Sequence, residues 1–400
     1  MMVPSARVSD LAEQVRGVTY GKDDASRTPA SGYLPILRAG NITDAGLVFD
    51  DLVYVPAAKV SAKQKIKQGD IVIAASSGSI DVVGKAAPAL RAFEGGFGAF
   101  CKVIRPNDKV DAGYLAQFFK TPNYRRTISS LAAGANINNL KSEHLDDLLL
   151  PLPALPEQRR IAAILDQADA LRAKRREALA HLDSLTQSIF IEMFGDSTVN
   201  PMGWPQPCLG ELLESGPQNG LYKPSTDYGT GTPILRIDAF YDGAVTKLTT
   251  LKRVRVTAEE VRVFGLAVED VVINRVNSIE YLGKCALIPA LQEPTVFESN
   301  MMRFKVASER VLPTYLVAFL QVPFIKEQIR AASKDAVNQS SINQQDVKAF
   351  KINVPPLALQ RTFATRIQAV DALKTTHRAA LAELDALFAS LQHRAFSGGL

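Results

Sequence analysis

The chain has 400 residues, 46% of them hydrophobic, which is enough to bury two cores of ordinary domain size. Its 46 Lys and Arg residues exceed its 41 Asp and Glu residues and give a net charge of +5. Such a small excess suits an anionic partner but does not by itself establish one. The three cysteines are scattered without Cys-x-x-Cys spacing, so they indicate neither a disulfide framework nor a zinc site and favour a reducing compartment.

No segment of the sequence favours a membrane. The first residues contain no apolar run of the kind found in a signal peptide. The most apolar stretch, residues 148–153, is interrupted by proline and is too short to cross a bilayer. We therefore expect a cytoplasmic protein with no membrane role.

Residues 1–150 are predicted to form a mixed α/β domain. Apolar runs bounded by Gly, Pro and Asn turns predict strands within 47–55, 70–74 and 100–104, and a helix is predicted at 113–120. Leucine then alternates with proline over residues 148–156. This alternation predicts an extended linker, because proline lacks a backbone N–H and restricts the residue before it.

A long helix is predicted to follow this linker and to end at about Phe194. Apolar or small residues recur three and four positions apart along it, which is typical of a helix that packs against another helix. The predicted apolar seam consists of Ile161, Ile164, Ala168, Leu171, Ala178, Leu182, Leu185 and Ile189, with Arg175 at its polar position.

The second half of the chain repeats this plan, with a β-rich domain from about Pro201, a proline-bearing linker at 354–356 and a second helix. The seam of that helix consists of Phe363, Val370, Leu373, Ala380, Leu384, Leu387 and Leu391, with Arg366 and His377 at polar positions. His377 aligns with Arg175. These two side chains either set the register of a helix pair or extend along the seam into solvent. The second interpretation is favoured for Arg175, and both stay open for His377.

The two halves match as an internal repeat, which is the kind of pattern that reveals a duplicated fold. The helices match closely: Asp169-Ala170-Leu171 aligns with Asp371-Ala372-Leu373 without a gap. The globular parts match more loosely, through Pro35-Ile36-Leu37-Arg38 with Pro233-Ile234-Leu235-Arg236 and Gly84-Lys85 with Gly283-Lys284. The helices are therefore expected to share one structural task, and the two domains to perform two different recognition tasks.

We predict an α+β fold in which two α/β domains are joined by two long helices that form an antiparallel coiled coil, related by a pseudo-two-fold internal repeat. Each seam is too long and narrow to be buried by its own domain, so it needs a second helix. The alternative is that each helix packs separately on a neighbouring protein.

No enzyme motif is found. The glycine-rich run at 95–98 lacks the spacing and context of a nucleotide-binding loop, and no Walker sequence is present. Residues 353–356 approach the Asn-Pro-Pro motif of amino-methyltransferases, but Val354 intervenes. The four histidines have neither metal-binding nor triad spacing. We predict a non-catalytic chain that has no catalytic residues and no metal site.

Polar loop residues recur at matching places in the two halves, and their types suit hydrogen bonds to base edges and phosphates. In a single loop, Asn, Ser and Gly are more often turn formers, so the recurrence carries the prediction. The predicted DNA-binding residues of the first half are Lys22, Arg27, Arg38, Asn41, Ser76, Ser77, Lys85, Asn136, Asn138, Asn139 and Lys141. Those of the second half are Asn219, Tyr222, Lys223, Arg236, Arg275, Asn277, Ser278, Lys284, Asn338, Gln339, Ser340, Ser341 and Asn343.

Over its whole length the chain resembles the specificity subunit of type I restriction-modification systems. The resemblance is carried by the Pro-Ile-Leu-Arg segments, by Tyr222-Lys223-Pro224-Ser225 and above all by the helix entry at 151–161, Pro-Leu-Pro-Ala-Leu-Pro-Glu-Gln-Arg-Arg-Ile. The second helix entry departs from this pattern, with Ala358-Leu359 where the first has Pro156-Glu157. The start of the second helix is therefore less defined by the sequence.

The resemblance implies target-recognition domains at 1–150 and 196–352, each followed by a linker and helix, at 151–195 and 353–400. It implies a bipartite double-stranded DNA site, with one half for each domain and a spacer set by the helices. It also implies two modification (methyltransferase) subunits and restriction (motor-nuclease) subunits as partners. No cofactor is expected on this chain, whereas S-adenosylmethionine, ATP and Mg are expected on the partner subunits.

Two other functions are alternatives. A scaffold with duplicated protein-binding domains would bind its partner with little dependence on salt, whereas phosphate contacts weaken steeply as salt rises. A freestanding DNA-modifying enzyme is disfavoured by the missing motifs.

Overall fold

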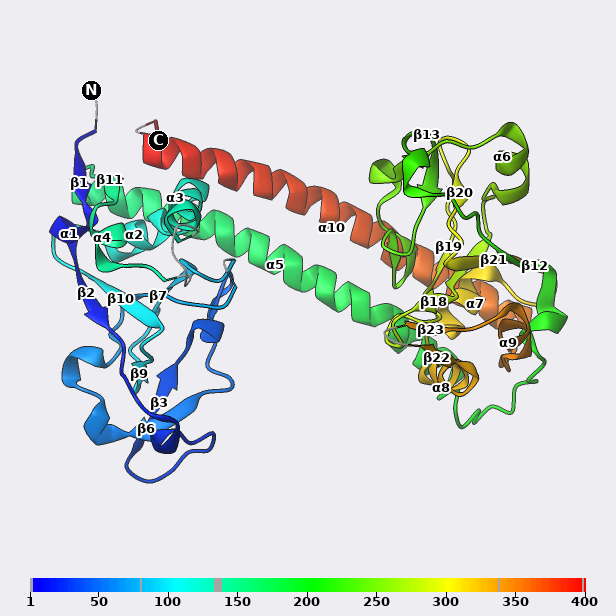
Figure 1. Cartoon of the computed structure of the whole chain (residues 1–400), viewed down its shortest axis with the longest axis horizontal. Helices are drawn as coiled ribbons and strands as arrows, with labels where there is room; N and C mark the ends of the chain where they lie inside the picture. Colours follow the sequence, from blue (N-terminus) through cyan, green and yellow to red (C-terminus); the bar gives the residue numbers. More distant parts are fainter. Residues whose placement is uncertain (1–2, 80, 133–138, 337–338, 398) are drawn as a thin grey trace. The chain divides into compact units, whose positions relative to one another are not determined.

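The computed structural model describes residues 3–79, 81–132, 139–336, 339–397 and 399–400. The chain divides into two compact units, one formed by Met1–Ala178 with His377–Leu400 and the other by Leu179–Thr376. Each unit contains one β-rich domain and one part of each long helix (Figure 1). The mixed α/β content predicted for both halves is confirmed.

The first unit is built around an antiparallel sheet in the order β2-β10-β7-β8. These strands are β2 (Ala12–Arg16), β7 (Ile71–Ala74), β8 (Ala86–Pro88) and β10 (Cys101–Pro106). A second sheet has the order β6-β3-β9, in which β3 (Tyr33–Leu37) is antiparallel to β6 (Val53–Pro56) and parallel to β9 (Gly96–Phe97). Two short pairs complete the unit: β1 (Ser5–Arg7) with β11 (Leu149–Pro151), and β4 (Ile42–Thr43) with β5 (Gly46–Leu47).

The central strand β7 separates two apolar cores, because successive side chains of a strand point to opposite faces. Ile71 and Ile73 pack in the core that contains the helical residues Tyr114 and Ile128, whereas Val72 packs in the core on the other face. The short helices of this unit are α1 (Val8–Leu11), α2 (Ala112–Phe118), α3 (Pro122–Ala132) and α4 (Ser142–Asp146).

The second unit repeats this arrangement with additional strands. Within its described residues, the main sheet has the order β12-β21-β17-β19-β15-β14. These strands are β12 (Leu213–Asn219), β14 (Phe240–Tyr241), β15 (Gly243–Val245), β17 (Val271–Asn274), β19 (Cys285–Leu287) and β21 (Met301–Val306). As in β7, alternate residues of β17 enter two cores, with Val271 and Ile273 on one face and Val272 on the other.

Two smaller sheets lie beside the main sheet of the second unit. In one, β13 (Tyr228–Leu235) is antiparallel to β16 (Lys252–Val254) and parallel to β20 (Val296–Phe297). In the other, β23 (Gln339–Ser341) pairs with β18 (Val276–Asn277) and β22 (Lys334–Ala336). The short helices are α6 (Ala258–Phe264), α7 (Pro313–Phe319), α8 (Pro323–Ala332) and α9 (Gln344–Ala349).

One glycine in each unit permits the same close approach of two chain segments. A Cβ on Gly17 would lie 2.0 Å from the carbonyl oxygen of Gly98, and a Cβ on Gly220 would lie 2.2 Å from that of Glu298. Only glycine leaves room for the backbone there. The segments that follow Gly17 and Gly220 are therefore held against the residues that follow β9 and β20.

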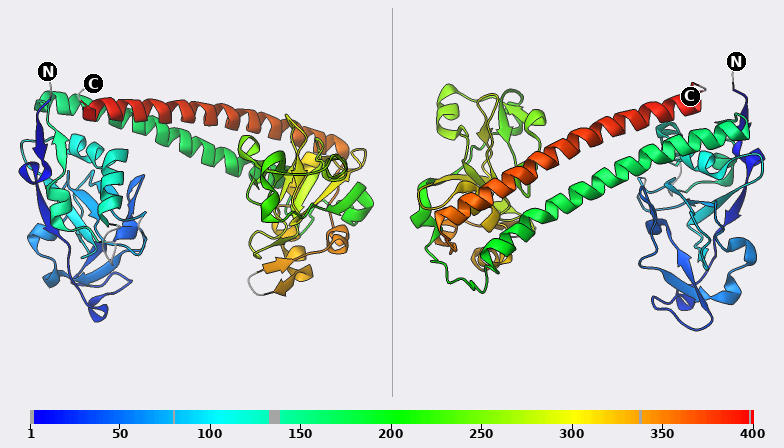
Figure 2. Two further views of the ribbon diagram at one scale, coloured as in Figure 1. Left: turned by 45° about the horizontal axis from the view of Figure 1, so that its top comes forward. Right: turned by 180° about the vertical axis from the view of Figure 1, so that it is seen from behind.

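The two predicted long helices are present, as α5 (Leu155–Phe194) and α10 (Leu357–Ser397). In the first unit, Ala395 of α10 shares an apolar core with Ile161 of α5, and Asp385 pairs with Arg172. Figure 2 shows α5 in green and α10 in orange to red. In the second unit, Phe363 of α10 packs on Phe194 of α5. Within each unit, residue numbers rise along one helix as they fall along the other, so the helices pair antiparallel there.

The predicted seam was wrong at four leucines, whereas its other apolar positions are buried or half-buried. Leu171, Leu185, Leu373 and Leu387 are 46%, 39%, 51% and 50% exposed. The less exposed stripe runs one residue later, through Leu165, Arg172, Leu179 and Thr186 on α5 and through Ile367, Lys374, Leu381 and Phe388 on α10. The heptad pattern allows both registers. A stripe whose spacings alternate as three then four shares every second position with one whose spacings alternate as four then three.

The observed register places charged residues between the helices, and these are paired. Arg172 contacts Asp385 at 2.6 Å and Asp169 at 2.9 Å, and its guanidinium lies over the ring of Phe388. In the second unit, Lys374 contacts Asp183 at 3.1 Å. Arg172 and Asp385 occupy the same places in the repeat as Lys374 and Asp183.

The two polar seam positions lie opposite each other. An Nη1 of Arg175 lies 3.1 Å from Nδ1 of His377. Because arginine only donates hydrogen bonds, the Nδ1 atom accepts in this contact. Neither side chain therefore simply extends along the seam into solvent, which was the favoured interpretation for Arg175.

Candidate nucleic-acid interface

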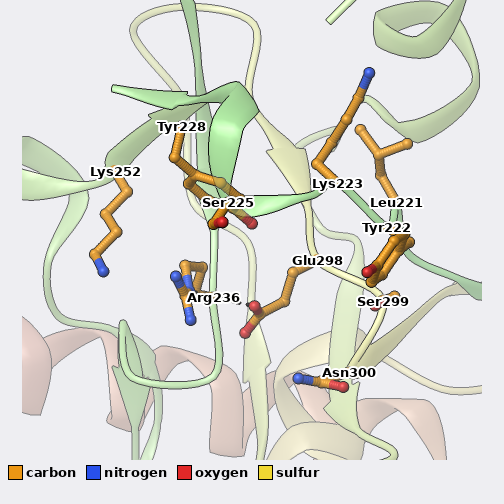
Figure 3. Close-up of a pocket in the computed structure, with 10 residues that line it drawn as sticks. All are labelled: Leu221, Tyr222, Lys223, Ser225, Tyr228, Arg236, Lys252, Glu298, Ser299 and Asn300. Atoms are coloured by element: carbon orange, nitrogen blue, oxygen red, sulfur yellow. Dashed lines mark ion pairs between the residues drawn. The ribbon is translucent and has the colours of Figure 1, made fainter. Parts of the chain in front are cut away.

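A surface hollow of the second unit collects polar side chains at the ends of several strands (Figure 3). Its lining consists of Leu221, Tyr222, Lys223, Ser225, Tyr228, Arg236, Lys252, Glu298, Ser299 and Asn300. Strands β13 and β20 run parallel, with Leu235 opposite Phe297, so the residues that follow them lie together. This register places Arg236 beside Glu298.

Glu298 is the anionic group of this hollow and is only 6% exposed. One carboxylate oxygen accepts a hydrogen bond from the N–H of Ile237 at 2.6 Å, and the other lies 3.2 Å from Nε of Arg236. Burial raises the pKa of Glu298, while the Ile237 N–H and the Arg236 charge oppose that rise. Arg236 also lies over the ring of Tyr228. The carboxylate is therefore held in one orientation at the hollow.

Cations and an exposed aromatic ring complete the hollow. Lys223 forms an ion pair of 2.8 Å with Glu260, and its hydrogen bond lowers the pKa of that carboxyl. Lys252 is exposed, and Tyr222 is 77% exposed. Lysines suit phosphate groups, and an exposed ring next to polar side chains suits the bases of a nucleic acid.

The first unit has the same slot with different side chains. Arg38 follows β3 as Arg236 follows β13, but it pairs with Asp51 at 2.6 Å. Gly98 takes the place of Glu298, with the ring of Tyr20 beside it, and burial raises the pKa of Tyr20. Phe100, at the place of Asn300, is 68% exposed. The two units therefore share a backbone frame and differ in the chemistry that they present.

The structure brings a second set of predicted residues together in each unit. In the first unit, Ser76 forms an isolated antiparallel bridge with Asn139, which joins the serine loop after β7 to the asparagine-rich segment. In the second unit, Asn277 pairs with Ser340 and Val276 with Ser341 across β18 and β23. Both units thus place these two polar segments side by side.

Most of the predicted residues reach the surface at least in part. Exposed are Lys22, Arg27, Asn139, Lys141, Asn219, Tyr222, Gln339 and Asn343. Half-buried are Arg38, Ser76, Ser77, Lys85, Lys223, Arg236, Arg275, Asn277, Ser278, Lys284 and Ser341. Asn41 and Ser340 are buried. Asn136, Asn138 and Asn338 lie outside the described residues.

Several of these side chains make bonds that support the fold. Asn41 accepts from the Arg38 N–H and donates to the carbonyl of Asp50. Asn343 caps α9 by accepting from the N–H groups of two residues in its first turn. Lys284 donates to the Ile237 carbonyl at 2.5 Å and lies over the ring of Tyr241 at 3.9 Å. These bonds hold loops in place at the surface where the other polar residues gather.

Sequence reasoning missed Ser225, Tyr228, Lys252, Glu298, Ser299 and Asn300. Its signal for Tyr222, Lys223 and Arg236 was recurrence between the halves, and Glu298 has no such signal because Gly98 replaces it. The residues described hold no group of three or more His, Cys, Asp or Glu side chains arranged to bind a metal ion. No described helix is both long enough and apolar enough to cross a membrane.

Comparison with known proteins identifies the family. A family described as type I restriction modification DNA specificity domain matches residues 5–181 and 201–386. The EcoKI specificity subunit of Escherichia coli is 33% identical over 99% of this chain and 88% of that protein. The StySPI specificity subunit of Salmonella potsdam is 32% identical over 99% of this chain and 89% of that protein.

Solved structures show the same fold. The type I S subunit from M. genitalium has a TM-score of 0.58 at 16% identity, covering 98% of this chain and 96% of that chain. A chain from a study of type I complex assembly has a TM-score of 0.55 at 19% identity, covering 99% and 98%. The chain belongs to the type I restriction-modification specificity subunits, which are non-catalytic components of their complexes. The family predicted from the sequence is thereby confirmed.

Proposed function

We propose that this chain recognises a bipartite double-stranded DNA site, with each domain reading one half. The observation that carries the proposal is the repeated slot after paired parallel strands. The second unit places Arg236 and Glu298 there, and the first unit places Arg38 and Gly98. Arginine and carboxylate side chains read base edges in the major groove. One frame with two sets of side chains suits two half-sites of unlike sequence.

The long helices are proposed to act as a coiled coil that sets the spacer between the half-sites. The antiparallel pairing within each unit and the equivalent ion pairs Arg172–Asp385 and Lys374–Asp183 support this role. Two linked domains that each bind DNA weakly gain affinity from the link only when both can bind the same duplex. A stiff connection therefore makes spacer length part of the recognised sequence.

Two modification subunits and the restriction subunits are proposed as protein partners, and these subunits would carry S-adenosylmethionine, ATP and Mg. The leucines that lie beside the helix stripe support the number of modification subunits. Leu171 and Leu373 are equivalent in the repeat, as are Leu185 and Leu387, and all four are exposed. Exposed apolar groups at repeated positions suit two copies of one partner.

The DNA proposal is tested by the salt dependence of duplex binding to the full chain. About four phosphate contacts would lower the affinity about a hundredfold when salt rises from about 50 to 200 mM. Lys252→Gln is expected to reduce the slope of log affinity against log salt by about 1. Lys305→Gln is the matched control, because Lys305 lies at the opposite end of β21 from Asn300 and pairs with Glu214. A duplex affinity that does not change with salt concentration would favour the protein-binding scaffold instead.

A further inference from the structure

A buried glutamine holds the start of each long helix against its domain. In the first unit, Gln158 is 1% exposed, and its carbonyl oxygen accepts from the N–H of Asp111 at 2.8 Å. Its amide group donates to the carbonyl of Pro153 at 2.8 Å. One side chain thus joins α5, the linker before it and the segment that begins α2.

The second unit repeats this network. Gln360 is 0% exposed, accepts from the N–H of Leu312 at 2.8 Å and donates to the carbonyl of Pro355 at 2.8 Å. Leu312 directly precedes α7 as Asp111 directly precedes α2. The same three elements are therefore joined by the same side chain, although the two helix entries differ in sequence.

A buried tyrosine completes each junction. The hydroxyl of Tyr114 donates to the carbonyl of Pro151 at 2.9 Å, and that of Tyr315 donates to the carbonyl of Asn353 at 2.6 Å. The ring of Tyr114 packs on Phe396 of α10, with centroids 5.1 Å apart, and the ring of Tyr315 packs on Phe194 of α5 at 4.9 Å. Each tyrosine therefore contacts its own linker and the end of the other helix.

We infer that Gln158 with Tyr114, and Gln360 with Tyr315, act as clamps that fix each recognition domain to the helix pair and thereby set spacer selectivity. The linkers contain prolines at 151, 153, 355 and 356, which have no N–H to donate. The clamps bind carbonyls of these linkers. They thereby hold the linkers in a fixed orientation, which the few backbone N–H groups of the linkers would not do alone.

The required stiffness follows from the geometry of DNA. One extra base pair in the spacer moves a half-site by about 3.4 Å and turns it by about a tenth of a revolution. A domain that rocks on its linker would tolerate that change, whereas a clamped domain would not. This inference rests on the proposed function, since it assumes a bipartite site. In this inference the four clamp residues position the recognition domains and do not contact DNA, because they lie in the core and not at the proposed DNA surface. They are Gln158, Tyr114, Gln360 and Tyr315.

The test compares Gln360→Met, Tyr315→Phe and wild-type chains by sequencing methylated sites in the host genome. We expect methylation at sites with the native spacer, relative to sites one base pair longer or shorter, to fall about fivefold for Gln360→Met, because a buried N–H and a carbonyl lose their partner. Tyr315→Phe keeps the ring and is expected to shift the ratio in the same direction. Both half-site sequences should stay unchanged.

Ile288→Val is the matched control, since Ile288 is 1% exposed and packs in a different core from the one that contains Tyr315. It should lower thermal stability without changing the spacer ratio. Unchanged spacer ratios in Tyr315→Phe and Gln360→Met, with lowered stability, would overturn the inference. If Gln360→Met abolishes methylation, the inference is tested by the ratio of native-spacer to altered-spacer methylation in Tyr315→Phe. An unchanged ratio in that variant would overturn it. A wild-type chain that gives no bipartite motif would instead contradict the proposed function.

Discussion

Arg236 and Glu298 illustrate how little of the site is visible in the sequence. Arg236 was predicted because it recurs as Arg38, whereas Glu298 has no counterpart in the first half. Strand β20 contains only two residues, and its parallel pairing with β13 joins segments that are far apart in the chain. Local sequence patterns do not predict such a pairing. The carboxylate that orients Arg236 could therefore be found only from the structure.

Asn41 and Asn343 have a structural role that was not predicted from the sequence. Their residue type and loop context predicted base contacts, but their amides bind the backbone that follows or precedes them. Asparagine competes well for local backbone groups, so it serves turns and caps as readily as ligands. A role in DNA contact stays a prediction for these two residues and for the other loop residues.

Glu298→Gln is expected to change base preference at one position of the second half-site only. A carboxylate only accepts hydrogen bonds, whereas an amide also donates, and a bidentate base contact contributes about 1–3 kcal/mol of discrimination. Sequencing of methylated sites in hosts carrying the variant measures the change. Glu293→Gln is the control, because Glu293 pairs with Arg253 outside the lining of the hollow. Altered preference in the first half-site would contradict the assignment.

Helix periodicity predicted α5 and α10, but it placed in their seams four leucines that the structure leaves exposed. The apolar leucines favoured a stripe through Leu171 and Leu373, while packing selected the stripe through Arg172 and Lys374. The charged residues of that stripe can lie between the helices because Asp385 pairs with Arg172 and Asp183 pairs with Lys374. Pairing across two helices is invisible to a pattern read along one helix.

The short strands were only partly predictable. Strands were expected within 70–74 and 100–104 and are found as β7 and β10, whose apolar runs are long enough to recognise. The run expected at 47–55 contains two separate strands, β5 and β6, with residues 48–52 between them. Strands of two or three residues derive their stability from neighbours in the sheet.

The leucines outside the stripe predict where modification subunits bind. Leu171→Ser is expected to weaken binding of one modification subunit, and Leu171→Ser with Leu373→Ser to weaken both, each by about 1.5 kcal/mol or more for a lost leucine contact. Light scattering of the assembled complex measures the number of copies bound. Leu90→Ser serves as control, because Leu90 is 83% exposed and lies in the first domain. Two bound copies with unchanged affinity in the double variant would exclude these leucines from the interface.

At the scale of the whole chain, duplication was the strongest sequence signal. It predicted two domains of similar fold, and the two units share the order of four sheet strands, β2-β10-β7-β8 and β12-β21-β17-β19. It did not predict that each compact unit would include the end of the helix that follows the other domain. That exchange depends on contacts such as Tyr114 with Phe396, which join distant parts of the sequence.

The central claim is that two readers on one chain are separated by a distance that the helices set. Inserting one heptad into each of α5 and α10, at equivalent positions of the repeat, preserves the buried stripe and lengthens each helix by about 10 Å. Sequencing of methylated sites in the host is the measurement that tests the claim. We predict the same two half-sites with a longer spacer. The same half-sites with an unaltered spacer would contradict the account.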